Sequence, residues 1–209
     1  MAFSTDSADT SAMLDKVAAG NSNALEHLLR LHRPYLIRVI EMRMEPALST
    51  RVDASDVAQE TQIMITRGIE QFIKNRPTSF RIWIRQKALD QLKDQRRRHI
   101  GTMKRSVFME QNISDVSSIE IARKLLSNSP SKILGQIELR ERIHQLIEQL
   151  GEIYREVLVL RHAEELTNAE VADLLDIAPD TARRRYGRAL RKLHQLFAEN
   201  GIGMDGEKE

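Results

Sequence analysis

The sequence predicts an all-α protein made of two small helical domains, joined by a polar linker, with a helix-turn-helix in the C-terminal domain. Aromatic residues make up only 4% of the chain, which disfavours a sheet. Apolar residues recur at helical spacing in successive segments, and Ser, Asn and Pro gather at residues 127–131 between two such segments. The predicted parts are a first domain over residues 11–100, a linker over 101–131, a second domain over 132–198 and a disordered tail over 199–209.

The first domain begins with a short predicted helix that ends at Gly20. Asn21 to Asn23 can cap the long helical run that follows, because short polar side chains accept hydrogen bonds from free amides. Pro34 lies inside this run and predicts a kink or a join, since proline lacks the amide that the helix needs. A polar stretch over residues 47–53 then precedes the next helix.

Two further helices complete the first domain. One is capped by Asp53 or Ser55 and reaches about Phe72. A break follows at residues 75–78. The other helix, which Thr78 or Ser79 can cap, runs from Phe80 to about Arg98. Its apolar stripe, on one face of the helix, is Phe80, Ile84, Ala88 and Leu92.

The second domain contains the more informative local signals. Two helical segments meet at Gly151, and a capping box follows, in which Thr167 and Glu170 can each bond the other's amide. A tight turn over residues 176–178 separates that short helix from a last, longer one. Pro179 suits the first position of the last helix, where its missing amide costs nothing. A short helix, a turn and a longer helix are the parts of a helix-turn-helix.

Positive charge is concentrated in two segments. Residues 81–105 carry a net charge of +7 and residues 181–198 carry +6, so the remainder of the chain carries −11. Two basic segments in an otherwise acidic protein predict two separate contacts with anions, of which nucleic acid is the commonest.

The last helix has two distinct faces. Its apolar face is Ala182, Tyr186, Ala189, Leu190, Leu193, Leu196 and Phe197. Arg184, Arg188 and Arg191 follow another face, which is what the DNA major groove admits. A basic amphipathic helix can also be a solvated surface or bind a membrane, so the preceding capped helix and turn are what favour DNA.

Residues 139–197 resemble region 4, the promoter-recognition domain of bacterial sigma factors. The similarity is clearest in the segments from Leu166 to Leu175 and from Arg188 to Leu193. It implies that the last helix enters the major groove of the −35 element. The residues implied in that contact are Thr181, Arg183, Arg184, Arg185, Arg188 and Arg191. Asp176 and Ala178 stand where the family usually has Gly and Ser, and Asp tolerates the left-handed geometry of such a turn.

Residues 24–99 resemble region 2 of the same family. The resemblance implies a surface that docks on the polymerase clamp: Asp56, Gln59, Glu60 and Thr61. It also implies a helix that binds and melts the −10 region through Phe80, Arg81, Trp83, Arg85, Lys87, Arg96, Arg97 and Arg98. Together the two matches cover roughly two thirds of the chain, and its shortness resembles the extracytoplasmic-function (ECF) type of the sigma-70 family.

Each of these segments also has a simpler structural interpretation. The acids near Asp56 could be a solvated helix face favoured by the helix dipole. Trp83 and Phe80 could be core anchors, because large aromatic side chains mostly pack. The basic run at residues 96–98 could complement the C-terminal end of its helix.

The resemblance implies core RNA polymerase and promoter DNA as partners and leaves an anti-sigma factor open. The chain lacks cysteine and its six histidines are scattered, so we expect neither an enzyme nor a metal or other cofactor, and no small-molecule substrate. Without a signal peptide or an apolar span, we expect a cytoplasmic protein that does not bind membranes. The alternatives are a stand-alone helix-turn-helix regulator, which leaves the first basic segment unexplained, and a helical scaffold protein.

Overall fold

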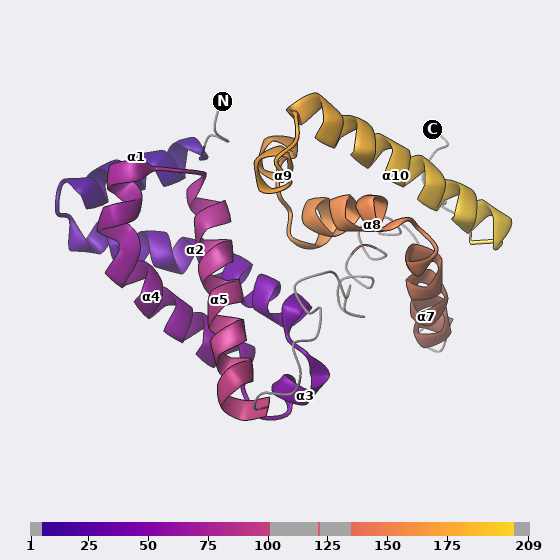
Figure 1. The fold of residues 1–209 in the computed structure, drawn as a ribbon, viewed down its shortest axis with the longest axis horizontal. Helices are drawn as coiled ribbons and strands as arrows, with labels where there is room; N and C mark the ends of the chain where they lie inside the picture. Colours follow the sequence, from indigo (N-terminus) through magenta and orange to yellow (C-terminus); the bar gives the residue numbers. More distant parts are fainter. Residues whose placement is uncertain (1–5, 101–120, 122–134, 203–209) are drawn as a thin grey trace. The chain divides into compact units, whose positions relative to one another are not determined.

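The computed structural model describes residues 6–100, 121 and 135–202, and every regular element in them is a helix (Figure 1). This confirms the predicted all-α fold. The chain divides into two compact units, residues 1–108 and 109–209. Apart from Ile121, the predicted linker at residues 101–131 lies outside the described residues, as does the tail after Ile202.

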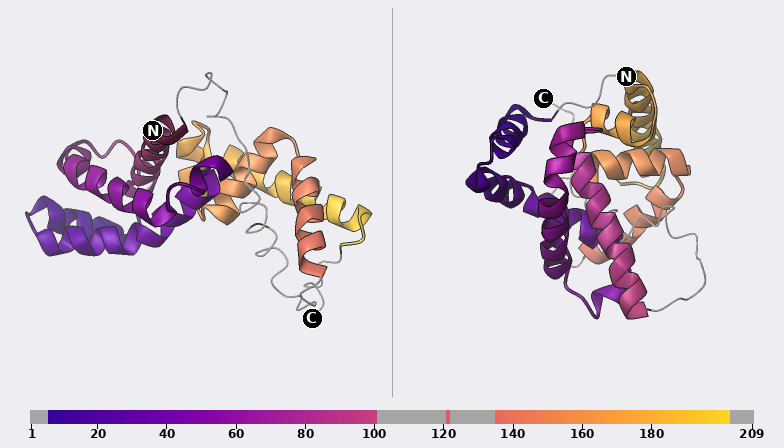
Figure 2. Two further views of the ribbon diagram at one scale, coloured as in Figure 1. Left: turned by 90° about the horizontal axis from the view of Figure 1, so that it is seen from below. Right: turned by 60° about the vertical axis from the view of Figure 1, so that its left-hand side comes forward.

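In the first unit, three long helices pack against one another in pairs, and two shorter helices cover their ends (Figures 1 and 2). The helices are α1 (Ala8–Ala18), α2 (Ser22–Arg43), α3 (Pro46–Ser49), α4 (Ala54–Asn75) and α5 (Phe80–Ile100). Helices α2, α4 and α5 form the mutual packing, α1 lies on α2 and α4, and α3 lies against α5.

The helix starts in this unit follow the predicted capping chemistry. Asn21 accepts a hydrogen bond from the amide of Ala24, and Asp53, rather than Ser55, caps α4. Helix α2 continues through Pro34 as one element, so the predicted join is absent. The stretch at residues 47–53 was predicted only as polar, but its first residues belong to the short helix α3, which begins at Pro46.

The core of the first unit is formed where α2, α4 and α5 meet. Fully buried apolar side chains come from all three: Leu28, Leu36, Val39, Ile40, Val57, Ala58, Ile65, Phe80, Ile84 and Ala88. The predicted stripe of α5 is confirmed, since Phe80, Ile84 and Ala88 are fully buried and Leu92 is 7% exposed. Burial of this stripe against two helices fixes which side of α5 faces water.

The second unit contains α7 (Gly135–Glu148), α8 (Glu152–Leu158), the π-helix η1 (Val159–Ala163), α9 (Asn168–Leu174) and α10 (Pro179–Glu199). Helix α10 packs along α8 and α9 and also touches α7 (Figure 1). The sequence predicted that the segment after Gly151 is an ordinary helix. Instead the backbone widens, with the amide of Glu164 bonded to the carbonyl of Val159 and that of Leu166 to Leu160.

None of the helices in the described parts of the chain combines the length and the apolar character that crossing a bilayer requires.

Candidate functional site

The helix-turn-helix of the second unit is formed by α9, the turn over residues 175–178 and α10. The capping box at α9 is present: the Thr167 hydroxyl accepts from the amide of Glu170 at 3.1 Å, and the Glu170 carboxylate accepts from the amide of Thr167 at 2.8 Å. In the turn, Asp176 adopts the expected left-handed conformation, with φ of 50°. Ala178 gives α10 no side-chain cap, and Pro179 occupies its first turn.

Helix α10 presents the two faces that its sequence predicts. Ala182, Ala189, Leu193 and Phe197 are buried against the rest of the unit. On the opposite side, Arg184, Arg188 and Arg191 are exposed, as is Arg183, whose guanidinium lies 3.4 Å from the carboxylate of Asp180. Thr181 and Arg185 are half-buried. The candidate −35 residues therefore lie on one helix, and four of its arginines point to solvent.

A cluster around Tyr186 fixes the rotation of α10. The Tyr186 hydroxyl and His162 Nε2 are hydrogen-bonded at 2.9 Å, and the Arg161 guanidinium lies 5.1 Å from the centre of the tyrosine ring. Arg161 also donates to the carbonyl of Leu166. Both partners of Tyr186 come from the π-helix, so the widened turn places side chains that hold the arginine face outward. The sequence alone gave no reason to connect His162 with α10.

The N-terminal end of α5 is anchored by a buried aromatic cluster. Phe80 is fully buried, and its ring packs against those of Phe72 and His32, with centres 5.6 and 5.1 Å apart. Trp83 is half-buried and stacks on Phe72 at 4.5 Å. Gly68 leaves room for the indole, because a Cβ there would lie 3.2 Å from Trp83. Phe80 and Trp83 therefore both pack against other aromatic side chains, and Phe80 presents no surface to DNA.

The first amides of α5 are also satisfied. The Asp6 carboxylate accepts from the amide of Phe80 at 2.7 Å, and the Ser79 hydroxyl accepts from that of Ile82 at 3.3 Å. Ser79, one of the two predicted caps, is therefore in use. The hydrogen bond to Asp6 links the start of the chain to the candidate −10 helix. It spans 74 residues of sequence, so no local pattern could predict it.

His32 lies beside this cluster and is kept neutral. Burial, and secondarily the positive charge of Arg81, lowers the pKa of His32 from 6.5 to about 4. Its Nε2 lies 3.3 Å from the hydroxyl of Thr10. A neutral imidazole at this place lets α1, α2 and α5 pack without a buried charge.

The cations in the first half of α5 are held by neighbouring groups. The Arg81 guanidinium lies 4.2 Å from the ring centre of Tyr35, and the Lys87 ammonium lies 5.7 Å from that of Trp83. Arg85 is 7% exposed. These cations lie on the predicted helix, but burial and aromatic contact limit how far they reach toward a ligand.

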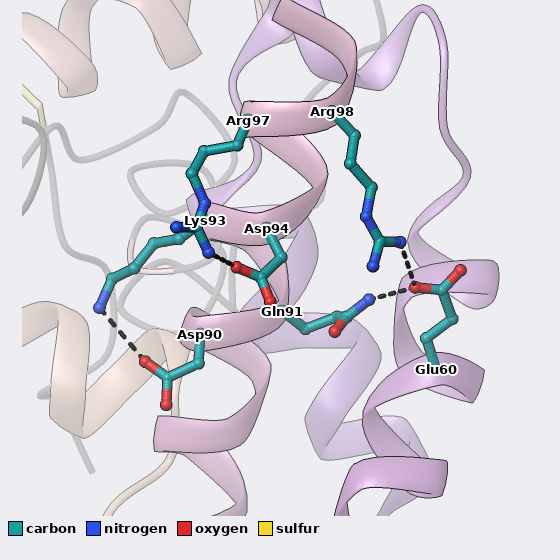
Figure 3. A network of polar contacts seen from close by, with 7 residues as sticks. All are labelled: Glu60, Asp90, Gln91, Lys93, Asp94, Arg97 and Arg98. Carbon is teal, nitrogen blue, oxygen red and sulfur yellow. Dashed lines mark hydrogen bonds and ion pairs between the residues drawn. The ribbon is translucent and has the colours of Figure 1, made fainter. Parts of the chain in front are cut away.

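Each arginine at the C-terminal end of α5 has a different acidic partner. Arg96 pairs with Glu45 at 3.2 Å. Arg97 pairs with Asp94 one turn earlier, and Arg98 with Glu60 of α4 at 3.6 Å (Figure 3). The side chains of Arg97 and Arg98 are 75% and 61% exposed, whereas that of Arg96 is 28% exposed. Arg97 and Arg98 are therefore the candidates best placed to meet a phosphate backbone.

The candidate polymerase surface divides along α4. Asp56 and Gln59 are exposed, but Thr61 is fully buried and its hydroxyl donates to the carbonyl of Val57 at 2.7 Å. Glu60 lies at the border, and its carboxylate accepts hydrogen bonds from Gln91 and Gln95 of α5. Neither glutamine was among the predicted site residues. Gln91 follows Ala88 by three residues and Gln95 follows Gln91 by four, so both glutamines continue the buried face of α5.

Comparison with known proteins agrees with both halves of this arrangement. The family described as "Sigma-70 region 2" matches residues 28–98, and "Sigma-70, region 4" matches residues 140–193. The chain belongs to the sigma-70 family. The first match spans α2 to α5, and the second spans the helix-turn-helix with the helices that support it.

Curated sigma factors align over nearly the whole chain. The RNA polymerase sigma factor CnrH of Cupriavidus metallidurans is 26% identical, with 87% of this chain and 91% of the relative covered. The ECF RNA polymerase sigma factor SigW of Bacillus subtilis is 25% identical, with 86% and 93% covered. The solved structure of CnrH in complex with the cytosolic domain of CnrY has the same fold, with a TM-score of 0.53, 20% identity and coverage of 91% of this chain and 98% of that one.

The protein is therefore an ECF-type sigma factor, a non-enzymatic initiation factor that binds core RNA polymerase and directs it to promoter DNA. The predicted family, class and main partners are confirmed.

Proposed function

We propose that this sigma factor docks on core polymerase through the exposed acid and amide at the start of α4, Asp56 and Gln59. The observation that supports this most is the division of the predicted surface, in which these two side chains face solvent while Thr61 is buried. A partner surface rich in cations would complement Asp56, which lies in the first turn of α4. Thr61 supports the helix from within.

We propose that promoter DNA is contacted by two helices with different tasks. Helix α10 supplies the duplex contact at the −35 element, where exposed arginines can take guanine edges or phosphates. Helix α5 supplies the −10 contact, in which Arg97 and Arg98 hold the backbone while bases leave the stack. Trp83, packed on Phe72, supports the loop before α5 instead of acting alone as a stacking platform.

An anti-sigma partner and a cytoplasmic location are also part of this proposal. CnrH was solved with the cytosolic domain of CnrY, and its chain is covered almost completely by this one. A protein domain that covers the α4 or α10 surface would compete with polymerase or DNA. The location follows from the function, because a sigma factor works where core polymerase and the chromosome are.

The test is binding of purified chain to sigma-free bacterial core polymerase, followed by gel filtration and by titration with a fluorescent label. We expect a one-to-one complex that Asp56→Asn with Gln59→Ala weakens roughly tenfold or more, as loss of a central charged contact would. The matched control is Glu70→Gln with Gln71→Ala, which removes an exposed acid and amide farther along the same helix. Equal weakening by both pairs, or no complex with the unmodified chain, contradicts the proposed surface.

A further inference from the structure

The carboxylate of Glu60 connects α4 to three successive turns of α5. Its Oε2 atom accepts from the side-chain amides of Gln91 and Gln95, the latter at 2.7 Å, and lies 3.6 Å from the Arg98 guanidinium. Figure 3 shows Gln91 and Arg98 reaching toward Glu60 from α5. These partners span the second half of the helix that the proposed function assigns to the −10 region.

The two glutamines make this contact more than a surface ion pair. Gln91 and Gln95 are each only 4% exposed, in the row of α5 that otherwise buries Ala88 and Ile84. An amide in that position must keep its hydrogen-bond partner, because a buried polar group without one costs about 1 to 3 kcal/mol. Apolar side chains would fill the row without such a demand, so the polar contact selects one alignment of α5 on α4.

The neighbouring ion pairs lack this property. Arg97 pairs with Asp94 within α5, and Lys93 pairs with Asp90 one turn earlier at 3.3 Å, so neither pair joins two helices (Figure 3). Arg96 pairs with Glu45, which precedes α3. Glu60 alone among these acids accepts from buried amides and also faces an exposed arginine.

We propose that Glu60 is a positioning residue for promoter opening, which acts through α5 and not through direct contact with polymerase. By holding Gln91 and Gln95 it fixes the rotation of the second half of α5, and by facing Arg98 it sets where that cation meets the DNA backbone. This inference rests on the proposed function, since it assigns a task to the −10 helix. It separates Glu60 from Asp56 and Gln59, with which the sequence grouped it.

The first experiment uses holoenzyme assembled from core polymerase and full-length chain. The template is a linear promoter that the unmodified holoenzyme has selected from a random-sequence library. We expect Glu60→Gln to slow open-complex formation on this duplex roughly tenfold or more, because hydrogen bonds to a charged group are among the stronger ones. On the same promoter with a mismatched, already open −10 segment the change should be under about threefold, since opening is then bypassed. Core affinity should also change less than about threefold, in contrast to Asp56→Asn with Gln59→Ala.

A charge exchange separates positioning from direct contact. The double substitution Glu60→Gln with Gln91→Glu moves the carboxylate from α4 to α5 but keeps an acceptor facing an amide and Arg98. If Glu60 acts through α5, the exchange should restore duplex opening to within about threefold of the unmodified chain. If Glu60 touches polymerase, the exchange leaves the defect in place, which would overturn the proposal.

A third variant covers the case in which the exchange lowers stability. Glu60→Asp keeps the charge on α4 but withdraws it by one methylene from the buried amides, so duplex opening should slow as it does with Glu60→Gln. Normal opening with either single variant overturns the inference, as does an equal loss on duplex and pre-opened templates. If Asp56→Asn with Gln59→Ala leaves core binding unchanged, the proposed docking surface fails while these template comparisons still decide the role of Glu60.

Discussion

The two basic helices, α5 and α10, differ in how they hold their positive charge. Along α5, Arg96, Arg97 and Arg98 face three different acids, and earlier cations lie over aromatic rings. Along α10, the carboxylate of Asp180 pairs with Arg183, whereas Arg184, Arg188 and Arg191 have no ion pair with another described residue. The start of α5 is buried at Phe80, whereas the start of α10 is exposed at Pro179.

This difference matches two modes of DNA recognition. A rigid helix whose arginines are not engaged by acids suits a duplex, whose groove and phosphates are already in place. We expect a helix whose cations are offset by acids from its own unit to bind DNA weakly when alone, and to depend on the polymerase to bring DNA to it. Arg184, Arg188 and Arg191 can direct their hydrogen bonds to DNA without first breaking an ion pair, so we expect them to contribute more to specificity than Arg183 does.

The largest expected effect comes from removing exposed arginines of α10, the helix proposed to bind duplex DNA. Replacing Arg184 and Arg188 together by Ala should weaken holoenzyme binding to the −35 duplex roughly a hundredfold or more, since each such contact contributes about 1 to 3 kcal/mol. Competition with a labelled duplex at several salt concentrations measures both affinity and salt dependence. The slope against salt should become shallower by about one for each phosphate that the variant no longer neutralises.

Arg97→Ala in α5 is the matched comparison, because this arginine is also exposed but paired with Asp94. We expect less than about tenfold loss of promoter affinity, since a surface pair already offsets part of its charge. A loss as large as that of the α10 double variant would remove the distinction between the two helices.

The second prediction concerns how α5 is anchored. The pKa of His32 is lowered from 6.5 to about 4, so the unfolded chain binds a proton first as the pH falls. The contribution of His32 to the free energy of unfolding is therefore complete above pH 6.5. It is lost as the pH falls from 6.5 to about 4, and the loss is about 3 kcal/mol at most. His32→Gln should flatten the pH dependence of stability in this window. Urea unfolding followed by the fluorescence of Trp83, the one tryptophan in the chain, reports on this unit.

His27→Gln is the control for that measurement, because His27 is an exposed histidine on the same helix. It should leave the pH dependence as in the unmodified chain. An equally steep loss of stability in the His32→Gln variant would mean that carboxylates, and not this buried imidazole, set the acid sensitivity of the first unit.

The smallest expected effects come from removing the acidic partner of one arginine in each helix. Asp94→Asn frees Arg97 and Asp180→Asn frees Arg183, and both pairs have the same spacing of three residues. Each change should strengthen DNA binding by less than about fivefold, because exposed pairs contribute about 0 to 1 kcal/mol. The gain with Asp94→Asn should appear in assays of the −10 segment, and that with Asp180→Asn in duplex binding at the −35 element. Weaker binding with Asp180→Asn would mean that this carboxylate itself takes part in base recognition.

Much of the fold was predictable because its signals are local. The capping box at Thr167, the left-handed turn at Asp176 and the apolar stripe from Phe80 to Leu92 each depend on residues a few positions apart. Helix α3 and the π-helix η1 were missed for the same reason. Neither has a spacing pattern of its own, and η1 continues from α8 and meets α10 through the contacts of Arg161 and His162 with Tyr186, which lie far apart in sequence.

The candidate site divides in the same way. The arginine face of α10 follows from helical periodicity, and the structure leaves it exposed. In the first unit the predicted residues were a mixture, since Phe80 and Thr61 lie in the core while Asp56, Gln59 and Arg97 lie at the surface. A short phrase such as Asp56 to Thr61 makes more than a full turn of helix, so its residues necessarily face different directions.

The sequence by itself determined the family, the helical architecture and the two places where positive charge gathers, because motif, periodicity and charge are properties of the chain. Tertiary packing decided which of those charges are offset and by which partner. Asp6 meets the start of α5, Glu60 meets Gln91 and Gln95, and His162 meets Tyr186, each across at least 24 residues of sequence. Such contacts form only when separate helices dock, since side chains far apart along the chain share no local spacing.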